Sequence, residues 1–240
     1  MITVPGDEAR VQMSEYNKSL AGFEIPLRLK SLPISPKGWP VPWFVGWIKN
    51  GKPCKPGDGE PDFRTMDGDK FKLALRQHRC WVCGGLLGIH KAFTIGPMCA
   101  INRVISEPPS HRDCAIFSAQ VCPFLSQPRM RRNEKDLPEE TTGPAGFHLK
   151  RNPGAICVWI TKSYRAFRPR HGGDGILFSL GHPLEVLWFA EGRKATRSEV
   201  MASINSGYPS LLEIAAQEGP SALEALERQR HIAVETLVPA

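Results

Sequence analysis

The chain has 240 residues, a formal net charge of +7 and a pI near 9.1. Hydrophobic residues make up 41% of it and charged residues 23%, which is typical of a folded soluble protein and excludes wholesale disorder. No apolar run approaches the roughly 18–20 residues of a membrane span, so we expect no membrane partner. The first residues lack the basic and apolar regions of a secretion signal, and we expect a cytoplasmic protein.

In chain order, residues 1–40 are rich in proline and show no hydrophobic period, so we expect a loosely attached N-terminal arm. A zinc-binding α+β half is predicted over residues 41–125. It begins with an aromatic and β-branched strand at 41–48, followed by a turn rich in Gly and Pro and a return strand at 63–66. A helix is predicted over 67–79, because its first residue is an aspartate suited to capping.

A charged linker with several prolines is predicted over residues 126–150, and a C-terminal α+β half with a helical tail over 151–240. This half opens with a buried type of strand at 155–161, which we expect to pair with a second strand at 176–180. The rest is predicted to be helical, with a strand as the alternative for the first segment. The helical segments are 182–192, 196–205, 209–219 and 221–237.

Cysteine usage points to a metal rather than to disulfides. The chain has seven cysteines, an odd number, and five of them lie between residues 80 and 122. In a reducing compartment such clustered cysteines more often bind metal. The seven are Cys54, Cys80, Cys83, Cys99, Cys114, Cys122 and Cys157.

The clearest motif is Cys-Trp-Val-Cys-Gly-Gly at residues 80–85. In such a turn the backbone amides point at the sulfurs and glycine permits a left-handed residue, so Cys80 and Cys83 can approach one ion. A closed tetrahedral zinc site needs two more ligands, and we predict that His111 and Cys114 supply them. Because four protein ligands leave no position for water, the predicted Zn²⁺ is structural.

The second pair of ligands is expected on the first turn of a helix. The S-x-x-D pattern at 110–113 is a capping motif, and it follows two prolines. His111 and Cys114 then share one helix face, where the helix dipole favours a thiolate. A knuckle, a hairpin at 86–105 and a helix that supplies two ligands resemble a treble-clef zinc finger over residues 79–122.

Alternative ligands and an alternative cluster remain open from the sequence alone. Cys99 could replace His111. Cys122 lies two turns beyond Cys114, about 12 Å along a helix axis, so both are not expected to bind one ion. An iron–sulfur cluster is the alternative to zinc, because it also takes sulfur ligands.

A nuclease of the HNH type is an alternative function. His90, Asn102 and His111 follow the order of that motif, in which a histidine acts as general base beside a divalent ion. The pattern departs from the family, because Ile89 stands where an aspartate usually precedes the first histidine. His111 also cannot close a structural zinc site and bind a catalytic ion at the same time.

Residues 150–171 contain six Lys or Arg residues and no acidic residue, with Trp159, Tyr164 and Phe167 among them. Basic charge interleaved with aromatic rings can hold phosphates and stack bases. The alternative is an ordinary solvated face. Residues 129–132 hold a second, smaller arginine cluster. As nucleic-acid-binding residues we single out Lys162, Arg165, Arg168 and Arg170.

The motif CWVCG…GPMCAINR…EPPSHRDCA…CPFL resembles an uncharacterised family of bacterial and phage proteins. The later segments AICVWIT and GILFSLGHP resemble the same family, and the resemblance covers about residues 40–235. It implies a phage or mobile-element setting but no activity.

These observations predict a zinc-stabilised binding protein that acts on nucleic acid or on a host defence protein. The alternatives are a metal-dependent nucleic-acid-processing hydrolase of HNH type, and a protein-directed inhibitor or adaptor that does not bind nucleic acid.

Overall fold

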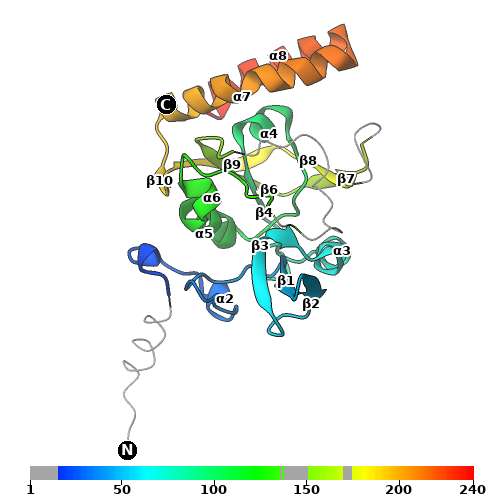
Figure 1. Ribbon diagram of the computed structural model, residues 1–240. Coiled ribbons are helices and arrows are strands. Elements are labelled where there is room, and N and C mark those ends of the chain that lie inside the picture. The colour runs from blue at the N-terminus through cyan, green and yellow to red at the C-terminus, as the bar shows by residue number, and fades with distance from the viewer. Residues whose placement is uncertain (1–15, 136, 138–150, 170–174) are drawn as a thin grey trace, which may run out of the picture.

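The computed structural model describes residues 16–135, 137, 151–169 and 175–240. The predicted α+β class is confirmed, because the described chain forms three small antiparallel sheets with helices packed around them (Figure 1). Among the described helices, none has the length and apolar character needed to cross a bilayer.

The first sheet lies next to the predicted capped helix. Its strands are ordered β2-β1-β3. The helix α3 (Gly68–Gln77) follows directly, and the Asp67 carboxylate accepts hydrogen bonds from the backbone N–H groups of Asp69 and Lys70. The two strands and the helix predicted over 41–79 are present, although the first strand begins only at Val45 and the predicted turn contains an additional strand, β2. The strands are β1 (Val45–Lys49), β2 (Lys52–Cys54) and β3 (Glu60–Met66).

The second sheet is the centre of the molecule, with strand order β10-β9-β6-β4. Its strand β6 is buried along its whole length, because helices cover both faces. On one face Val158 and Ile160 pack with alanines of α5 (Arg112–Val121), and on the other Trp159 packs with α4 (Pro97–Asn102) and α7 (Arg197–Glu218). The strands are β4 (Lys91–Ile95), β6 (Ile156–Thr161), β9 (Pro183–Ala190) and β10 (Arg193–Lys194).

The central sheet joins the two predicted halves of the chain. β4 belongs to the segment 41–125, whereas β6, β9 and β10 belong to 151–240. The two segments therefore share one sheet, and both contribute to the main hydrophobic core on one of its faces. Of the predicted linker between them, residues 136 and 138–150 lie outside the described residues.

The third sheet has the strand order β5-β8-β7. The side chain of Phe178 packs it against the central sheet and α3. The ring of Phe178 lies 5.8 Å from that of Tyr164 and 6.4 Å from those of Phe93 and Phe71. The predicted pairing of 155–161 with 176–180 is wrong, because β6 pairs with β4 and β9 instead. The strands are β5 (Val104–Ile105), β7 (Tyr164–Phe167) and β8 (Leu177–Leu180).

The helix predicted over 182–192 is also wrong, and the strand alternative is right. This segment forms β9, with Pro183 as its first residue and Gly192 in the turn to β10. Leu187 and Trp188 contact the cores on opposite faces of the sheet, an alternation that only a strand provides.

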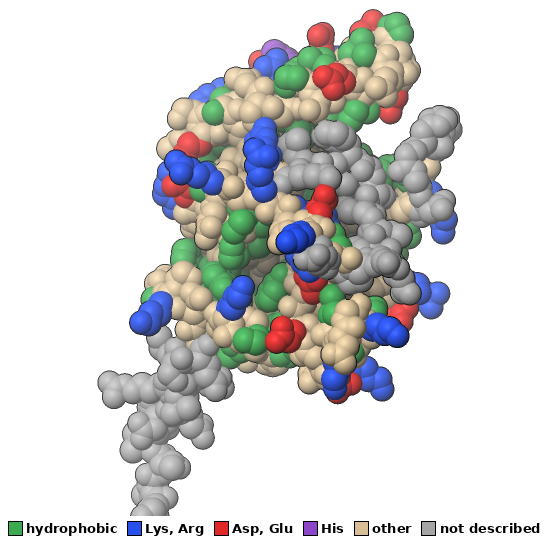
Figure 2. Space-filling model, viewed as in Figure 1, with side chains coloured by type: hydrophobic (Ala, Val, Ile, Leu, Met, Phe, Trp, Pro, Cys, Tyr) green, Lys and Arg blue, Asp and Glu red, His purple; other side chains and the backbone are tan. Residues whose placement is uncertain are grey.

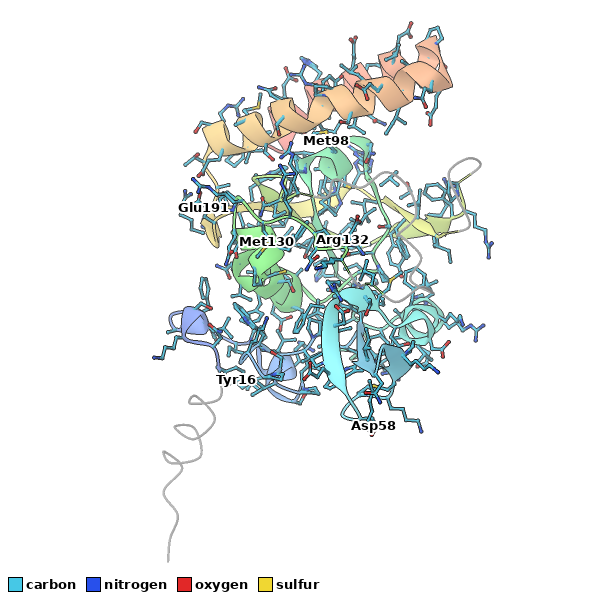
Figure 3. All side chains as sticks on the ribbon, in the orientation of Figure 1. Tyr16, Asp58, Met98, Met130, Arg132 and Glu191 are labelled. Atoms are coloured by element: carbon cyan, nitrogen blue, oxygen red, sulfur yellow. The ribbon has the colours of Figure 1, made fainter. Side chains whose placement is uncertain are left out.

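The segments predicted as two helices, 196–205 and 209–219, form one helix, α7, which continues through Gly207 and Pro209. Gly207 does not end the helix because it lies against Met98 of α4, where a Cβ would meet the Met98 sulfur at 3.1 Å (Figure 3). The predicted last helix is present as α8 (Pro220–Thr236).

The described part of the N-terminal arm is packed, contrary to the expectation of loose attachment. Residues 16–40 contain a 3₁₀ turn, η1 (Lys18–Leu20), and the short helix α2 (Leu27–Lys30). Leu20 and Leu29 are 4% and 1% exposed, and they join a small core around Cys80 and Cys114. These two leucines anchor the arm.

We predict that Phe178→Ala lowers the free energy of unfolding by about 3–5 kcal/mol, because it removes a buried ring and leaves a cavity between the sheets and α3. Phe63→Ala is the control, since Phe63 is 49% exposed and should cost less than about 1 kcal/mol. Urea unfolding followed by tryptophan fluorescence measures both values. Equal losses in the two variants would contradict this account of the core.

Candidate metal centre

The turn at residues 80–85 brings two cysteines together. The N–H of Gly84 donates to the Cys80 carbonyl at 2.8 Å, and the N–H of Cys80 donates to the Gly85 carbonyl at 2.7 Å. Gly84 has a φ of +73°, and a Cβ there would lie 2.7 Å from the ring of Trp43. The turn therefore needs glycine for its backbone conformation and for its packing.

The start of α5 brings the other two ligands to this turn. The S-x-x-D cap predicted at 110–113 does not form, because His111 is the N-cap residue and no side chain caps the helix. Cys114 lies in the first turn of the helix, as predicted. The segment before the helix is held by two contacts. Ser110 pairs with Ala92 of β4, and the backbone N–H of Trp81 donates to the Pro109 carbonyl at 3.0 Å.

The four predicted ligand residues form one cluster. Their ligand atoms all lie within 4.8 Å of one another, and Cys83 Sγ lies 3.4 Å from His111 Nδ1. A tetrahedral zinc with Zn–S bonds near 2.3 Å separates its sulfurs by about 3.8 Å, so the cluster has a suitable size. Cys80 and Cys114 are fully buried, and the arrangement is compatible with a closed site.

Hydrogen bonds with nearby backbone groups orient the side chains of the cluster. The backbone N–H groups of Cys83 and His111 donate to Cys80 Sγ at 3.4 and 3.3 Å. His111 Nε2 lies 2.9 Å from the Leu86 carbonyl oxygen, to which it can donate, leaving the lone pair of Nδ1 for a metal. The hydrogen bond with Cys80 raises the pKa of His111, while burial opposes this.

The closely spaced thiols shift one another's pKa values in opposite directions. Burial raises the pKa of Cys80, but hydrogen bonds with Cys114, Cys83 and His111 outweigh it and hold that pKa well below its usual value. Hydrogen bonds with Cys80 and Cys83, together with burial, raise the pKa of Cys114. Three thiolates can therefore form here only beside a cation, and this donor set fits zinc.

The other candidate cysteines lie outside the cluster. Cys99 is on α4 against the main core, where burial raises the pKa of its thiol to about 12. Cys122 is the residue that ends α5. Neither belongs to the group that could hold an ion, so replacement of His111 by Cys99 has no geometric support.

The hairpin predicted at 86–105 is wrong in its second strand. Pro97 begins the helix α4 there, and β4 pairs with β6 and, through one bridge, with Ser110. A proline at the first helical position favours the helix, since its missing N–H costs nothing there.

The residues of the HNH pattern are not brought together as a metal site. His90 is exposed before β4, and the side-chain oxygen of Asn102 accepts from the Val104 N–H at 3.0 Å. His111 faces the sulfurs. Within the described part of the chain, the sulfur cluster is the one group of three or more His, Cys, Asp or Glu side chains suited to a metal.

Lys162, Arg165 and Arg168 are exposed on β7 and beside it, whereas Arg170 lies outside the described residues. Two of the interleaved aromatic residues are not available for stacking. Trp159 is 0% exposed and donates to the Gly181 carbonyl, and Tyr164 packs edge-on against Phe93 at 5.6 Å.

The second arginine cluster lies apart from β7. Arg131 pairs with Arg151, and Arg132 donates to the backbone carbonyl of Arg64 on β3 at 3.2 Å (Figure 3). Arg151 in turn contacts Ser206 of α7. These arginines hold segments of the chain together.

Three basic residues near Lys162 are missed by the sequence analysis. In the central sheet Lys91 is the direct partner of Thr161, so it lies next to Lys162, and the exposed His90 precedes it. His182 is exposed at the same end, just before β9. Only the register of the sheet shows that these residues are neighbours, because no local sequence motif indicates it.

Comparisons with models of known protein families, with curated proteins and with solved structures find no match for this chain. What the site does must therefore be inferred from its geometry.

We predict about one zinc per chain in protein purified without a metal-affinity tag, measured by elemental analysis. Cys80→Ser and Cys114→Ser should each lose the metal and lower the melting temperature, because both sulfurs are buried in the cluster. Cys122→Ser is the matched control on the same helix and should retain the zinc. Full zinc content in Cys80→Ser, or iron in place of zinc, would contradict this assignment.

Proposed function

We propose that this protein is a zinc-stabilised nucleic-acid-binding protein. In this proposal, zinc bound by Cys80, Cys83, His111 and Cys114 forms a treble-clef-like module from the knuckle, β4 and α5. The order of these elements and the closeness of the four ligand atoms support it. The ion has a structural role, because four protein ligands close its coordination sphere.

Phosphate groups are contacted in this proposal by one end of the two adjoining sheets, which we call the basic end. Figure 2 shows that on the face in view Lys and Arg side chains alternate with Asp and Glu, so net charge alone makes no continuous basic surface there. The basic end differs, because within the described residues none of its members forms an ion pair. Its members are His90, Lys91, Lys162, Arg165 and His182, whereas the predicted Arg168 lies beyond the other end of β7.

The observation that carries the proposal is the register of β4 with β6, in which Lys91 is opposite Thr161 and therefore beside Lys162. Residues far apart in the chain thus add to one cluster of uncompensated positive charge. Such a cluster attracts a phosphate backbone and releases its counterions.

The metal centre supports this surface from two sides. The loop at 84–90 runs from the knuckle directly into Lys91. Arg112, next to His111, forms two hydrogen bonds of 2.7 and 2.8 Å with Glu185 of β9. Loss of the metal should therefore disturb the basic end as well as the knuckle.

A host protein is the second candidate partner, favoured by two exposed apolar side chains. Leu86 and Ile89 are 68% and 70% exposed in the loop after the knuckle. Large exposed apolar residues that lie close together are typical of protein contact sites. The phage setting implied by the family resemblance stays a prediction.

We predict that binding to fluorescein-labelled DNA or RNA, measured by anisotropy, weakens steeply with salt. The combined change Lys91→Ala, Lys162→Ala and Arg165→Ala should weaken binding at least tenfold and make the salt slope shallower, because each lost phosphate contact lowers it by about 0.7–0.9. The double change Lys52→Ala and Lys55→Ala, in β2 and directly after it, should leave binding unchanged. Absent or salt-independent binding would refute the proposal.

For the second candidate, Leu86→Ser with Ile89→Ser should abolish capture of a host protein by the tagged chain while the zinc content stays unchanged. Capture of the same protein by this double variant would exclude the loop as the contact site.

A further inference from the structure

The loop at residues 84–90 presents two aliphatic side chains to solvent directly before the basic end. Leu86 and Ile89 are 68% and 70% exposed, whereas Leu87 packs into the small core of the N-terminal segment. Gly88 adds no side chain, and a Cβ there would meet no atom within 4 Å, so the tip of the loop is narrow and open. Large exposed apolar side chains that lie close together mark a place that a partner covers.

The backbone of this loop is held on both sides of its tip. The Leu86 carbonyl oxygen lies 2.9 Å from His111 Nε2. On the other side, the ammonium group of Lys91 donates to the Ile89 carbonyl at 2.9 Å, which uses one of its three N–H donors. Because the loop is already ordered, a contact that uses these side chains pays little additional conformational entropy.

Positive charge adjoins the two aliphatic side chains. Lys91 follows two residues after Ile89, and the register of the central sheet places it next to Lys162. Glu185, near the start of β9, is paired with Arg112 at 2.7 Å and does not offset this charge. A partner that uses both features has dense negative charge beside an apolar interior that a narrow loop can enter.

Among nucleic acids, a single strand is a poor match for this surface, because single strands are held by bases that stack on exposed aromatic rings. Trp159 is fully buried and Tyr164 packs against Phe93. Phe167 lies at the other end of β7, opposite Leu177.

Duplex DNA matches both features of the surface. Leu and Ile side chains can enter the minor groove as wedges between two base pairs, which they partly unstack while the duplex bends. The minor groove of B-DNA is about 6 Å wide and suits a narrow loop, whereas that of A-form RNA is wide and shallow.

We propose that the basic end binds duplex DNA and that Leu86 and Ile89 form a wedge that enters the minor groove and unstacks one base step. Lys91 and Lys162 contact the phosphates beside the wedge. This inference rests on the proposed function and specifies its substrate, and it assigns the two aliphatic side chains to DNA rather than to a host protein.

The test uses the full-length, metal-loaded protein and a DNA duplex of about 20 base pairs with 2-aminopurine at a central TA step. The fluorescence of this base rises when it is unstacked, and pyrimidine–purine steps unstack most easily. Binding is expected to raise the fluorescence about twofold or more. The double change Leu86→Ala and Ile89→Ala should abolish this rise but keep the salt slope of binding, because the phosphate contacts remain. Ile232→Ala, at a 45% exposed position on α8, is the control and should unstack the DNA normally.

The possible outcomes separate the wedge from nucleic-acid binding itself. Salt-dependent binding without a fluorescence rise, an equal rise in the double variant, or tighter binding of the single strand than of the duplex would each overturn the wedge. Absence of salt-dependent binding to any DNA or RNA would instead refute the proposed function, and the wedge with it. The double variant should keep its zinc and its melting temperature, because both side chains are exposed, so misfolding does not account for a loss of unstacking.

Discussion

The sulfur atom of Cys80 is the point on which the knuckle, α5 and the N-terminal segment converge. It accepts hydrogen bonds from the backbone of its own turn and from the N-cap of α5, while two further sulfurs and an imidazole crowd around it. Hydrogen bonds favour one thiolate at Cys80, but three thiolates can form in this space only beside a cation. Cys80 and Cys114 are also members of the apolar cluster that holds the N-terminal segment, together with Leu20, Leu29 and Phe117. A metal ion bound to the four side chains would therefore couple its binding free energy to the folding of this region.

The central sheet extends this local constraint to the rest of the molecule. β4 leaves the knuckle loop and pairs with β6, and β6 pairs with β9, which Glu185 connects back to α5 through Arg112. The candidate metal centre is therefore connected to the central sheet twice, through β4 and through the ion pair between α5 and β9. A disturbance of the knuckle is transmitted to the basic end through strands, which deform less readily than loops.

Local interactions determine the features of the fold that the sequence predicts correctly. The spacing of the four ligands depends on one turn and one helix start, and Asp67 and Thr196 cap their helices through contacts within three residues. These features need no knowledge of the remaining chain, and the structure agrees with them except for the S-x-x-D cap of α5, which does not form. The placement of the ligands in space, but not the identity of the ion, follows from the geometry.

Contacts between residues far apart in the chain override local preference in the elements that the sequence predicts wrongly. β9 has the composition of either a helix or a strand, and only burial between two cores selects the strand. Gly207 would end an isolated helix, yet contact with Met98 allows α7 to continue. The neighbourhood of Lys91 and Lys162 depends on a strand pair some seventy residues apart, for which the local sequence contains no pattern.

The late arrival of β6 has a consequence for how the chain is made. β4 leaves the ribosome well before its partner, and Phe93 and Ile95, each about 2% exposed or less in the folded protein, have no sheet to cover them in the interval. Such unpaired apolar strands are prone to association with other chains. Early capture of a metal ion by the knuckle and α5, both complete by residue 121, would fix the flanks of β4 during this period and shorten its exposure. A metal ion bound at this site would thus protect the nascent chain as well as stabilise the finished fold.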